Sequence, residues 1–319
     1  MMTPPPPGVS PPSRPAFPAG PRASAGDFLR VMRPRQWTKN LVVLAAFFFA
    51  LGDRQQPFDH ARGACWALLA AALFCAVSSA VYVFNDIMDR DRDREHPVKR
   101  HRPIAAGRIA PAPAAGLAAI LATGGLACAW LVSPGFALSL VAYVLLQAAY
   151  TLWLKHVALV DVFVIAAGFV LRAVAGGLAV HVIISNWLLI CTFLMALFLA
   201  LCKRRHEKRL ADDTRLFALR PSLAESDERL FDQLIAISAG AAIVAYAIYT
   251  QSPDTVSKFG TSHLSWTLPF VIFGIFRYLD LVYRQAKGDQ PEYILLTDVP
   301  LIVDILFFGL SVLWVFIAA

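Results

Sequence analysis

The sequence predicts an all-α membrane protein that crosses the bilayer several times, and three observations support this. Of the 319 residues, 58% are hydrophobic and only 16% are charged, whereas soluble domains have about 45–50% apolar and about 25% charged residues. The mean hydropathy is +0.58. The apolar residues form continuous runs, unlike the alternating pattern of a membrane β-barrel. These features exclude a soluble globule, a disulfide-rich secreted scaffold and a soluble nucleic-acid-binding protein, so no nucleic acid partner is expected.

The chain begins with a proline-rich stretch. Residues 1–26 contain nine of the 21 prolines, among Ala, Gly and Ser. Such a composition cannot bury enough apolar surface to fold. We therefore expect a disordered tail over 1–26 and one transmembrane domain over 27–319 that carries the chemistry.

Nine apolar segments follow the tail. They cover residues 38–52, 64–84, 113–132, 135–154, 157–180, 186–202, 232–250, 264–283 and 299–319. Most of them reach the ~20 residues that a helix needs to cross the hydrocarbon core. The first is short unless its helix begins near Met32. The prediction is a bundle of nine transmembrane helices.

The basic residues lie mostly on one side of the predicted bundle. With nine crossings, 24 of the 29 Lys and Arg residues fall on the side of the N-terminus, and three fall on the other side. Because Lys and Arg remain in cytoplasmic loops, we expect a multi-pass protein of the cell membrane whose long loops 85–112 and 203–231 face the cytoplasm. The net charge of +7 suits anionic headgroups or phosphorylated substrates.

A cluster of acidic side chains marks the cytoplasmic end of the second segment. If the helix continues at about 100° per residue, four oxygen-bearing side chains share one face: Asn85, Asp86, Asp89 and Asp93. Converging carboxylates repel one another unless a cation lies between them, and hard oxygen ligands suit Mg²⁺. The alternative is a solvated loop in which Asp and Arg pair. The location at the end of a membrane helix favours a magnesium site.

Basic side chains follow in the same loop. Lys99 and Arg102 lie close behind the carboxylates in the run Lys99-Arg100-His101-Arg102-Pro103-Ile104-Ala105-Ala106-Gly107-Arg108. Cations beside a metal site can take phosphate oxygens that the metal does not reach. Positive loops are also typical of the cytoplasmic side, so a phosphate-binding role stays one of two interpretations.

The turn between the fourth and fifth segments and the fifth segment itself carry further candidates for binding the phosphates of a substrate. Tyr150 and Lys155 flank this turn, and Asp161 follows one turn into the fifth segment. Asp161 could hold a second metal ion or pair with Lys155 or Arg172. Arg172 lies deeper, where an ionisable group is costly unless it faces a cavity or a partner.

Two more basic groups lie at segment ends. Lys39 opens the first segment, where it could also serve as an interfacial anchor, and Lys203 and Arg204 end the sixth. The latter pair could equally be a cluster that only stops membrane insertion.

These residues resemble a known family. The pattern Asn-Asp-x-x-Asp-x-x-x-Asp, followed by Lys-Arg-x-Arg-Pro-Ile-Ala-x-Gly and set among nine apolar segments, is similar to that of the UbiA superfamily of intramembrane prenyltransferases. Within it, Met32-Arg33-Pro34-Arg35-Gln36-Trp37-Thr38-Lys39-Asn40 and Leu171-Arg172-Ala173-Val174-Ala175-Gly176-Gly177 resemble the branch of decaprenyl-phosphate phosphoribosyltransferases. Ordinary members usually carry a second carboxylate cluster where this chain has Lys203-Arg204-Arg205-His206-Glu207.

The resemblance implies a UbiA-type bundle and a specific reaction. Phosphoribose would pass from phosphoribosyl diphosphate (PRPP) to decaprenyl phosphate or a similar polyprenyl phosphate, with release of diphosphate, in the synthesis of arabinan precursors for the cell wall. Mg²⁺ held by Asp86, Asp89 and Asp93 would stabilise the leaving group, and Asn85 would orient its water or a phosphate oxygen. The phosphate ligands would come from the basic candidates, namely Lys39, Lys99, Arg102, Lys155, Lys203 and Arg204.

Two alternatives stay open. One is a UbiA-type prenyltransferase that uses a polyprenyl diphosphate and an aromatic or haem acceptor. The other is a transporter of anionic solutes, which would carry ionisable residues near mid-membrane on several helices and an inverted repeat. The polar chemistry gathers at one face, which favours an enzyme. The resemblance is also consistent with a homo-oligomer in the lipid membrane.

Overall fold

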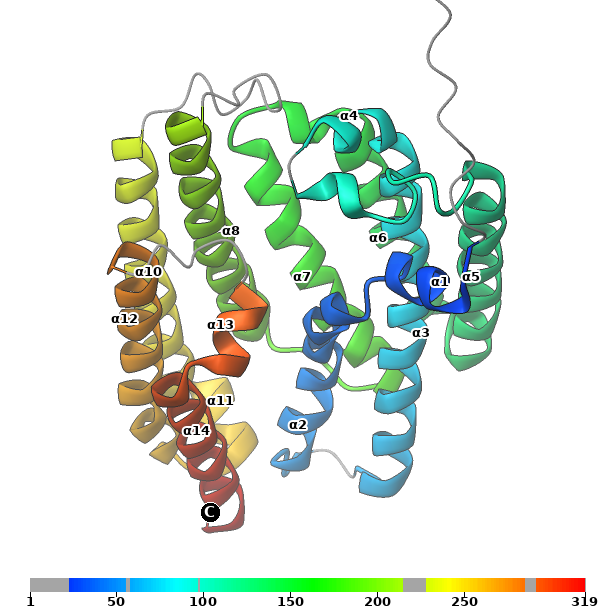
Figure 1. The fold of residues 1–319 in the computed structure, drawn as a ribbon. Helices are drawn as coiled ribbons and strands as arrows, with labels where there is room; N and C mark the ends of the chain where they lie inside the picture. The colour runs from blue at the N-terminus through cyan, green and yellow to red at the C-terminus, as the bar shows by residue number, and fades with distance from the viewer. Residues whose placement is uncertain (1–22, 56–57, 97, 215–227, 285–290, 319) are drawn as a thin grey trace, which may run out of the picture.

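A computed structural model describes residues 23–55, 58–96, 98–214, 228–284 and 291–318, and within these ranges every regular element is a helix (Figure 1). Eight stretches are long and apolar enough to cross a membrane. They lie in α3 (His60–Met88), α5 (Pro111–Val132), α6 (Pro134–Leu152), α7 (Val160–Val180), α8 (Asn186–Thr214), α10 (Glu228–Gln251), α12 (Leu268–Arg284) and α14 (Val299–Ala318). The span in α8 is Asn186–Arg209, and the span of α12 includes the preceding 3₁₀ helix and covers His263–Arg284. The prediction of an all-α, multi-pass membrane protein is confirmed.

Shorter elements connect and cap these helices. They are α1 (Ala25–Val31), η1 (Pro34–Leu44), α2 (Ala45–Leu51), α4 (Arg90–Glu95), η2 (Lys99–His101), η3 (Leu154–His156), α11 (Pro253–Phe259), η5 (His263–Thr267) and α13 (Pro291–Thr297), with η denoting a 3₁₀ helix. Of the predicted tail 1–26, residues 1–22 lie outside the described ranges, and Ala25 and Gly26 already belong to α1. Ser24 caps this helix by accepting the backbone N–H of Asp27 at 3.2 Å.

The first apolar segment, 38–52, does not form the predicted membrane-spanning α-helix. It is divided between the 3₁₀ helix η1 and the seven-residue helix α2, so the prediction of nine helices is wrong here and eight candidate spans are found in the described chain. Polar side chains dock η1 onto α3. Trp37 Nε1 donates to Ser79 Oγ at 3.0 Å, and Asn40 Nδ2 donates to Ser78 Oγ at 3.0 Å.

A close approach to α7 fixes the same segment on its other side. A Cβ atom at Gly176 would lie 2.0 Å from the carbonyl oxygen of Val43, so only glycine lets the backbones come this close. The segment still runs from one end of the bundle to the other. Arg33 contacts Asp86 near the end of α3, whereas the Arg54 N–H donates to the Lys258 carbonyl at 3.0 Å beside α11.

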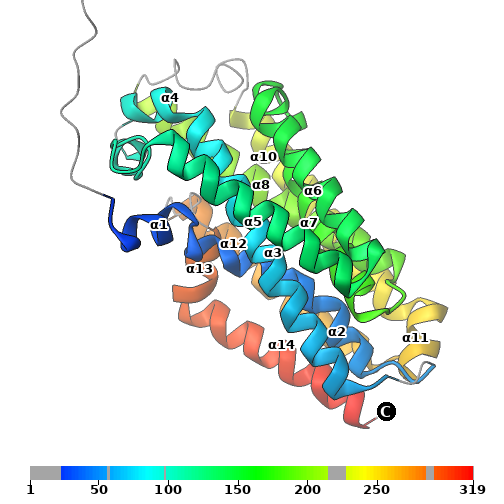
Figure 2. The same cartoon turned by 90° about the vertical axis from the view of Figure 1, so that its right-hand side faces the viewer.

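Two apolar cores hold the long helices together. One lies among α3, α6 and α7 and includes Phe74 and Tyr143, and the other lies among α8, α10 and α12 and includes Phe198 and Tyr278. In Figure 1, α7 and α8 lie between the group α10, α12 and α14 and the pair α3 and α5. Figure 2 shows the long helices running side by side with a common tilt in that view.

Large apolar side chains also cover the outside of the bundle. Leu131 is 83% exposed, Ile120 71% and Ile317 76%. A soluble protein would not present so much apolar surface, whereas lipid accommodates it. This outer surface agrees with the multi-pass assignment.

Candidate active site

The acidic motif lies where α3 ends, and the helix does not continue through it as predicted. The last residue of α3 is Met88, Asp89 follows with φ −92° and ψ 3°, and α4 begins at Arg90. The continuous helix expected through residues 85–93 is therefore wrong, because Asp93 belongs to a separate short helix. Asp91 points away from the other carboxylates, with a side chain 90% exposed.

One arginine nevertheless brings two of the carboxylates together. Arg102 Nη1 donates to Asp86 Oδ1 at 3.1 Å and to Asp93 Oδ2 at 2.6 Å. Asp86, which is 2% exposed, also accepts from Arg33 Nη2 at the same oxygen. Two buried carboxylates thus share a small volume whose negative charge arginines balance.

The third carboxylate is held from the α6–α7 turn. Lys155, 8% exposed on η3, donates from Nζ to Asp89 Oδ1 at 2.6 Å. Tyr150 and Lys155 flank this turn as predicted, so the turn delivers a cation to the acidic motif. Lysine and carboxylate at this separation form a strong, charge-assisted contact.

The loop after α4 is fixed by its own packing, and this positions Arg102. Ile104 and Ile109 are buried against α1 and α3 in a cluster with Val31 and Val83. Arg94 Nε donates to the Ala105 carbonyl at 3.1 Å. The sequence Pro-Ile-Ala-x-Gly is therefore a folded support rather than a solvated loop.

The loop is also tied to α1. Arg108 Nε lies 3.0 Å from Asp27 Oδ1. The Ser24 hydrogen bonds to Asp27, together with Arg108, hold the pKa of this carboxyl below its usual range. Through this contact, α1 helps to hold the loop that carries Arg102.

A second charged cluster surrounds Arg204 on α8. This residue is 4% exposed, its Nε lies 2.5 Å from Asp161 Oδ2, and its Nη2 donates to the Tyr150 hydroxyl at 3.1 Å. Glu207 accepts from Nη1. Asp161 thus pairs with Arg204 and not with Lys155 or Arg172, the partners considered from the sequence.

His96 lies between the two clusters. Its Nδ1 accepts the backbone N–H groups of Val98 at 3.2 Å and Lys99 at 3.3 Å. Burial is the main cause that lowers the His96 pKa, and nearby Lys99 adds to it, while Asp93 and Glu207 act in the opposite direction. The carboxylates of both clusters are therefore within electrostatic reach of one imidazole.

The remaining candidates separate into two groups. Arg172 lies inside the bundle, 4% exposed, and donates to Asn40 Oδ1, the Gly168 carbonyl and the Tyr143 hydroxyl at 2.8–3.0 Å. All three of its guanidinium nitrogens are used, so the structure gives Arg172 a packing role. By contrast, Lys39 in the middle of η1, Lys99 at the start of η2 and Lys203 within α8 are half-buried.

The oxygen donors of the acidic motif bear on a possible Mg²⁺ site. Within the described ranges, no three His, Cys, Asp or Glu side chains are close enough to share a metal ion. However, Asn85 Oδ1 is buried and accepts no hydrogen bond from any described residue. An orphaned amide oxygen next to Asp86, with further carboxylates alongside, is the chemistry that Mg²⁺ prefers. The residues present fit a magnesium ion if the basic partners release the carboxylates.

Arg33 contacts Asp86, although the sequence did not predict it as a site residue. It has φ 54° and ψ 62°, a left-handed conformation that is rare for a residue with a side chain. Its guanidinium lies 5.4 Å from the Tyr82 ring centroid. The only signal was its place in the motif Met32-Arg33-Pro34, because nothing local predicts a contact 53 residues away.

Comparison with known proteins agrees with this architecture. The model of the UbiA prenyltransferase family matches residues 40–296 of this chain. Decaprenyl-phosphate phosphoribosyltransferase of Mycolicibacterium smegmatis is 35% identical over 87% of this chain and 88% of its own length. The protein of the same name from Mycobacterium tuberculosis is 37% identical over 85% of this chain and 87% of its own length.

A solved structure gives the same fold. A UbiA homologue from Archaeoglobus fulgidus, bound to GPP and Mg²⁺, superposes with a TM-score of 0.67 at 17% identity, over 91% of this chain and 99% of that one. This likeness concerns the fold alone. With the family match over most of the chain, it establishes that the protein belongs to the UbiA prenyltransferase family.

Proposed function

We propose that this protein transfers 5-phosphoribose from PRPP to the phosphate of decaprenyl phosphate or a similar polyprenyl phosphate and releases diphosphate. The observation that carries the proposal is the similarity to the two mycobacterial phosphoribosyltransferases over nearly the whole chain. The site supports it, because four carboxylates and four cations gather at one end of the bundle.

Asn85, Asp86, Asp89 and Asp93 are the residues that would hold Mg²⁺. Bound there, the ion would neutralise the charge that develops on the departing diphosphate. Arg33, Arg102 and Lys155 now pair with the same carboxylates. With the carboxylates engaged, these cations can turn to phosphate oxygens of the donor, which binds and orients it.

The reaction needs little proton transfer. The bond from the anomeric carbon to diphosphate breaks, and a bond from that carbon to an acceptor phosphate oxygen forms. The acceptor is already an anion, so no strong base is required. Lys203, half-buried beside Arg204, is the candidate for holding a second anionic group. Arg204 itself is engaged by Asp161, Glu207 and Tyr150.

The decisive experiment compares two donors. Purified protein is given labelled PRPP with decaprenyl phosphate or, separately, a labelled prenyl diphosphate with an aromatic or haem acceptor. We expect label from PRPP in the lipid phase, dependent on Mg²⁺ and abolished by EDTA. Turnover of the prenyl diphosphate with no transfer from PRPP would establish the prenyltransferase alternative instead.

A further inference from the structure

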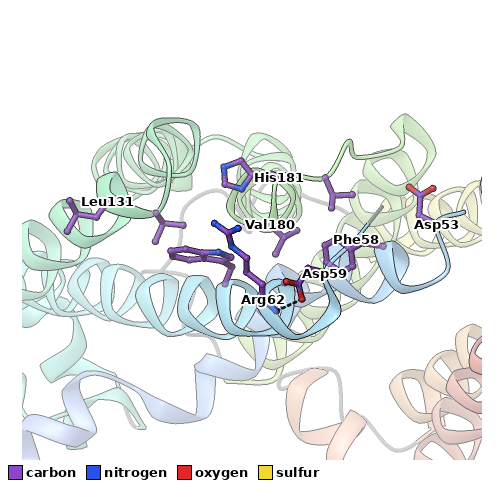
Figure 3. A pocket seen from close by; sticks show the side chains of 12 residues that line it. Asp53, Phe58, Asp59, Arg62, Leu131, Val180 and His181 are labelled. Atoms are coloured by element: carbon purple, nitrogen blue, oxygen red, sulfur yellow. Dashed lines mark hydrogen bonds between the residues drawn. The ribbon is translucent and has the colours of Figure 1, made fainter. Parts of the chain in front are cut away.

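A pocket lies at the end of the bundle opposite the carboxylates. It has a volume of about 520 Å³ and opens between the end of α2, the start of α3 and the ends of α5 and α7 (Figure 3). Ligand pockets typically range from about 300 to 1,000 Å³. Nothing in the proposed reaction uses this pocket.

Two basic side chains meet in it. Arg62, in the first turn of α3, and His181, directly after α7, point toward one another across the opening in Figure 3. Neither side chain has a hydrogen bond or an ion pair with another described residue. His181 has φ 59°, so an unusual backbone conformation directs its imidazole into the pocket. Two hydrogen-bond donors that face a common space are typical of an anion site.

Acidic groups occupy one side of these donors. Asp53 is already engaged, because its carboxylate lies 3.2 Å from Lys258 Nζ and accepts the Gln55 N–H at 2.9 Å. Asp59 accepts the Arg62 backbone N–H at 3.0 Å through Oδ1, while its Oδ2 has no partner among the described residues. Asp59 therefore offers one free oxygen to a cationic group beside the anion site.

Apolar groups occupy the other side. In Figure 3, Leu131 lies on the side of Arg62 and His181 away from Asp53 and Asp59, and it opens onto the apolar outer surface. Trp66 and Val180 are further apolar residues of the lining. Tryptophan is typical of the membrane interface, where one part of a ligand is polar and the other is apolar.

We propose that this pocket binds the headgroup of a phospholipid that carries both a phosphate and an ammonium group. Arg62 and His181 hold the phosphate, Asp59 accepts the ammonium, and the glycerol and acyl parts lie against Trp66 and Leu131. The order of charges along the pocket selects this class over an anionic lipid such as phosphatidylglycerol, because an ammonium group can pair with Asp59 whereas a neutral glycerol cannot. The lipid belongs to the leaflet at the end of the bundle away from the carboxylates.

The test measures binding by thermal stabilisation of the full chain in detergent. The probes are dihexanoyl phosphatidylethanolamine, dihexanoyl phosphatidylglycerol and inorganic phosphate. Arg62→Gln and His181→Asn remove the phosphate donors, and Asn tolerates the left-handed conformation at 181. Asp59→Asn removes the negative charge but keeps the helix cap. Arg54→Gln is the matched control, since it is an exposed arginine at the same end outside the pocket.

Phosphatidylethanolamine should stabilise the wild type saturably and in preference to phosphatidylglycerol. Arg62→Gln should weaken its binding about tenfold, the loss expected for one charged hydrogen bond, while Arg54→Gln keeps it. Asp59→Asn should remove the preference between the two lipids. An equal response of Arg62→Gln and wild type would overturn the site. Saturable stabilisation by inorganic phosphate alone would assign the pocket to a free anion, and the lipid assignment would then be wrong.

Discussion

At the scale of single residues, the central feature is that two arginines converge on one carboxylate oxygen. Asp86 Oδ1 accepts from both Arg33 and Arg102. A charge this deeply buried must be paired, because desolvation without a partner costs several kcal/mol. The same oxygen would be a natural metal ligand. Metal binding and these ion pairs therefore compete, and the arginines become available to phosphate when Mg²⁺ engages the carboxylate.

Asp86→Asn tests this assignment. The substitution keeps the size of the side chain and one acceptor oxygen but removes the negative charge. We expect phosphoribosyl transfer to fall by about a hundredfold or more, the size of effect seen when one charge-stabilising group is lost. The melting temperature should fall as well, because Arg33 and Arg102 lose the buried carboxylate that they share. Asp91→Asn, at a side chain 90% exposed, should retain the wild-type rate. Near-normal turnover by Asp86→Asn at saturating Mg²⁺ would contradict a metal-binding role.

His96 gives the site a pH dependence. Its neutral Nδ1 accepts two backbone N–H groups, and burial lowers its pKa from the ordinary value of about 6.5. The folded turn therefore favours the neutral ring. The stability of the turn is fully present above the unfolded pKa and is lost as pH falls through the lower folded pKa.

His96→Asn is the corresponding variant, because an Asn side chain can accept the same backbone N–H groups but does not titrate. The rate of the wild type should fall as pH drops below about 6.5, and the variant should lose part of this acid limb. The measurement is the pH profile of the transfer rate for both proteins. Identical acid limbs would show that His96 does not control the turn.

At the scale of elements, the first segment is the part of the fold that depends most on distant contacts. Trp37 and Asn40 bond to α3, and Val43 lies against Gly176 of α7. These contacts place Arg33 beside Asp86. A small change in the packing of η1 should therefore affect both stability and activity.

Gly176→Ala should show this coupling. The added Cβ would meet the Val43 carbonyl at 2.0 Å, and relief of such a clash typically costs about 1–3 kcal/mol. We expect a lower melting temperature and a reduced transfer rate. Gly116→Ala is the control, because a Cβ there meets nothing within 4 Å, and alanine favours a helix interior by about 0.5–1 kcal/mol. Equal melting temperatures for the two variants would contradict the close approach.

The limits of sequence reasoning are clearest at this scale. Continuous apolar runs predicted the eight long helices because hydrophobicity over about 20 residues is a local property. The shape of η1 and the break at Asp89 were not predicted, since each depends on partners far along the chain. Arg102, Lys155 and Arg204 were identified as candidates by charge and position, but their individual carboxylate partners required the folded structure.

Truncation of the N-terminus tests whether α1 supports the site. The proline content of the tail predicts that residues 1–26 are dispensable. However, Ser24 within this range caps α1, and Asp27 directly after it holds Arg108. Deletion of residues 1–22 should leave turnover unchanged. Deletion of residues 1–27 should lower it, because the loop that carries Arg102 loses a support. Equal rates for the two truncations, measured with the same PRPP assay, would show that α1 does not support the site.

At the scale of the whole molecule, charge distinguishes the two ends of the bundle. Arg33, Arg102, Lys155 and Arg204 lie with the carboxylates, whereas Arg54 and Lys258 lie at the opposite end. Although η1 and α2 are not one α-helix, the first segment still connects the two ends. The orientation expected from the basic loops, with the carboxylates on the cytoplasmic side, therefore stays a prediction.

Cysteine labelling in intact cells tests this orientation. In a background in which all five native cysteines are replaced, Arg54→Cys and Arg92→Cys introduce exposed thiols at the two ends. A membrane-impermeant maleimide should label Arg54→Cys from outside, and Arg92→Cys only after permeabilisation, since positively charged loops stay inside during insertion. Both PRPP and the basic site would then face the cytoplasm. Labelling of Arg92→Cys in intact cells would reverse the topology, and a cytoplasmic donor could no longer reach the carboxylates.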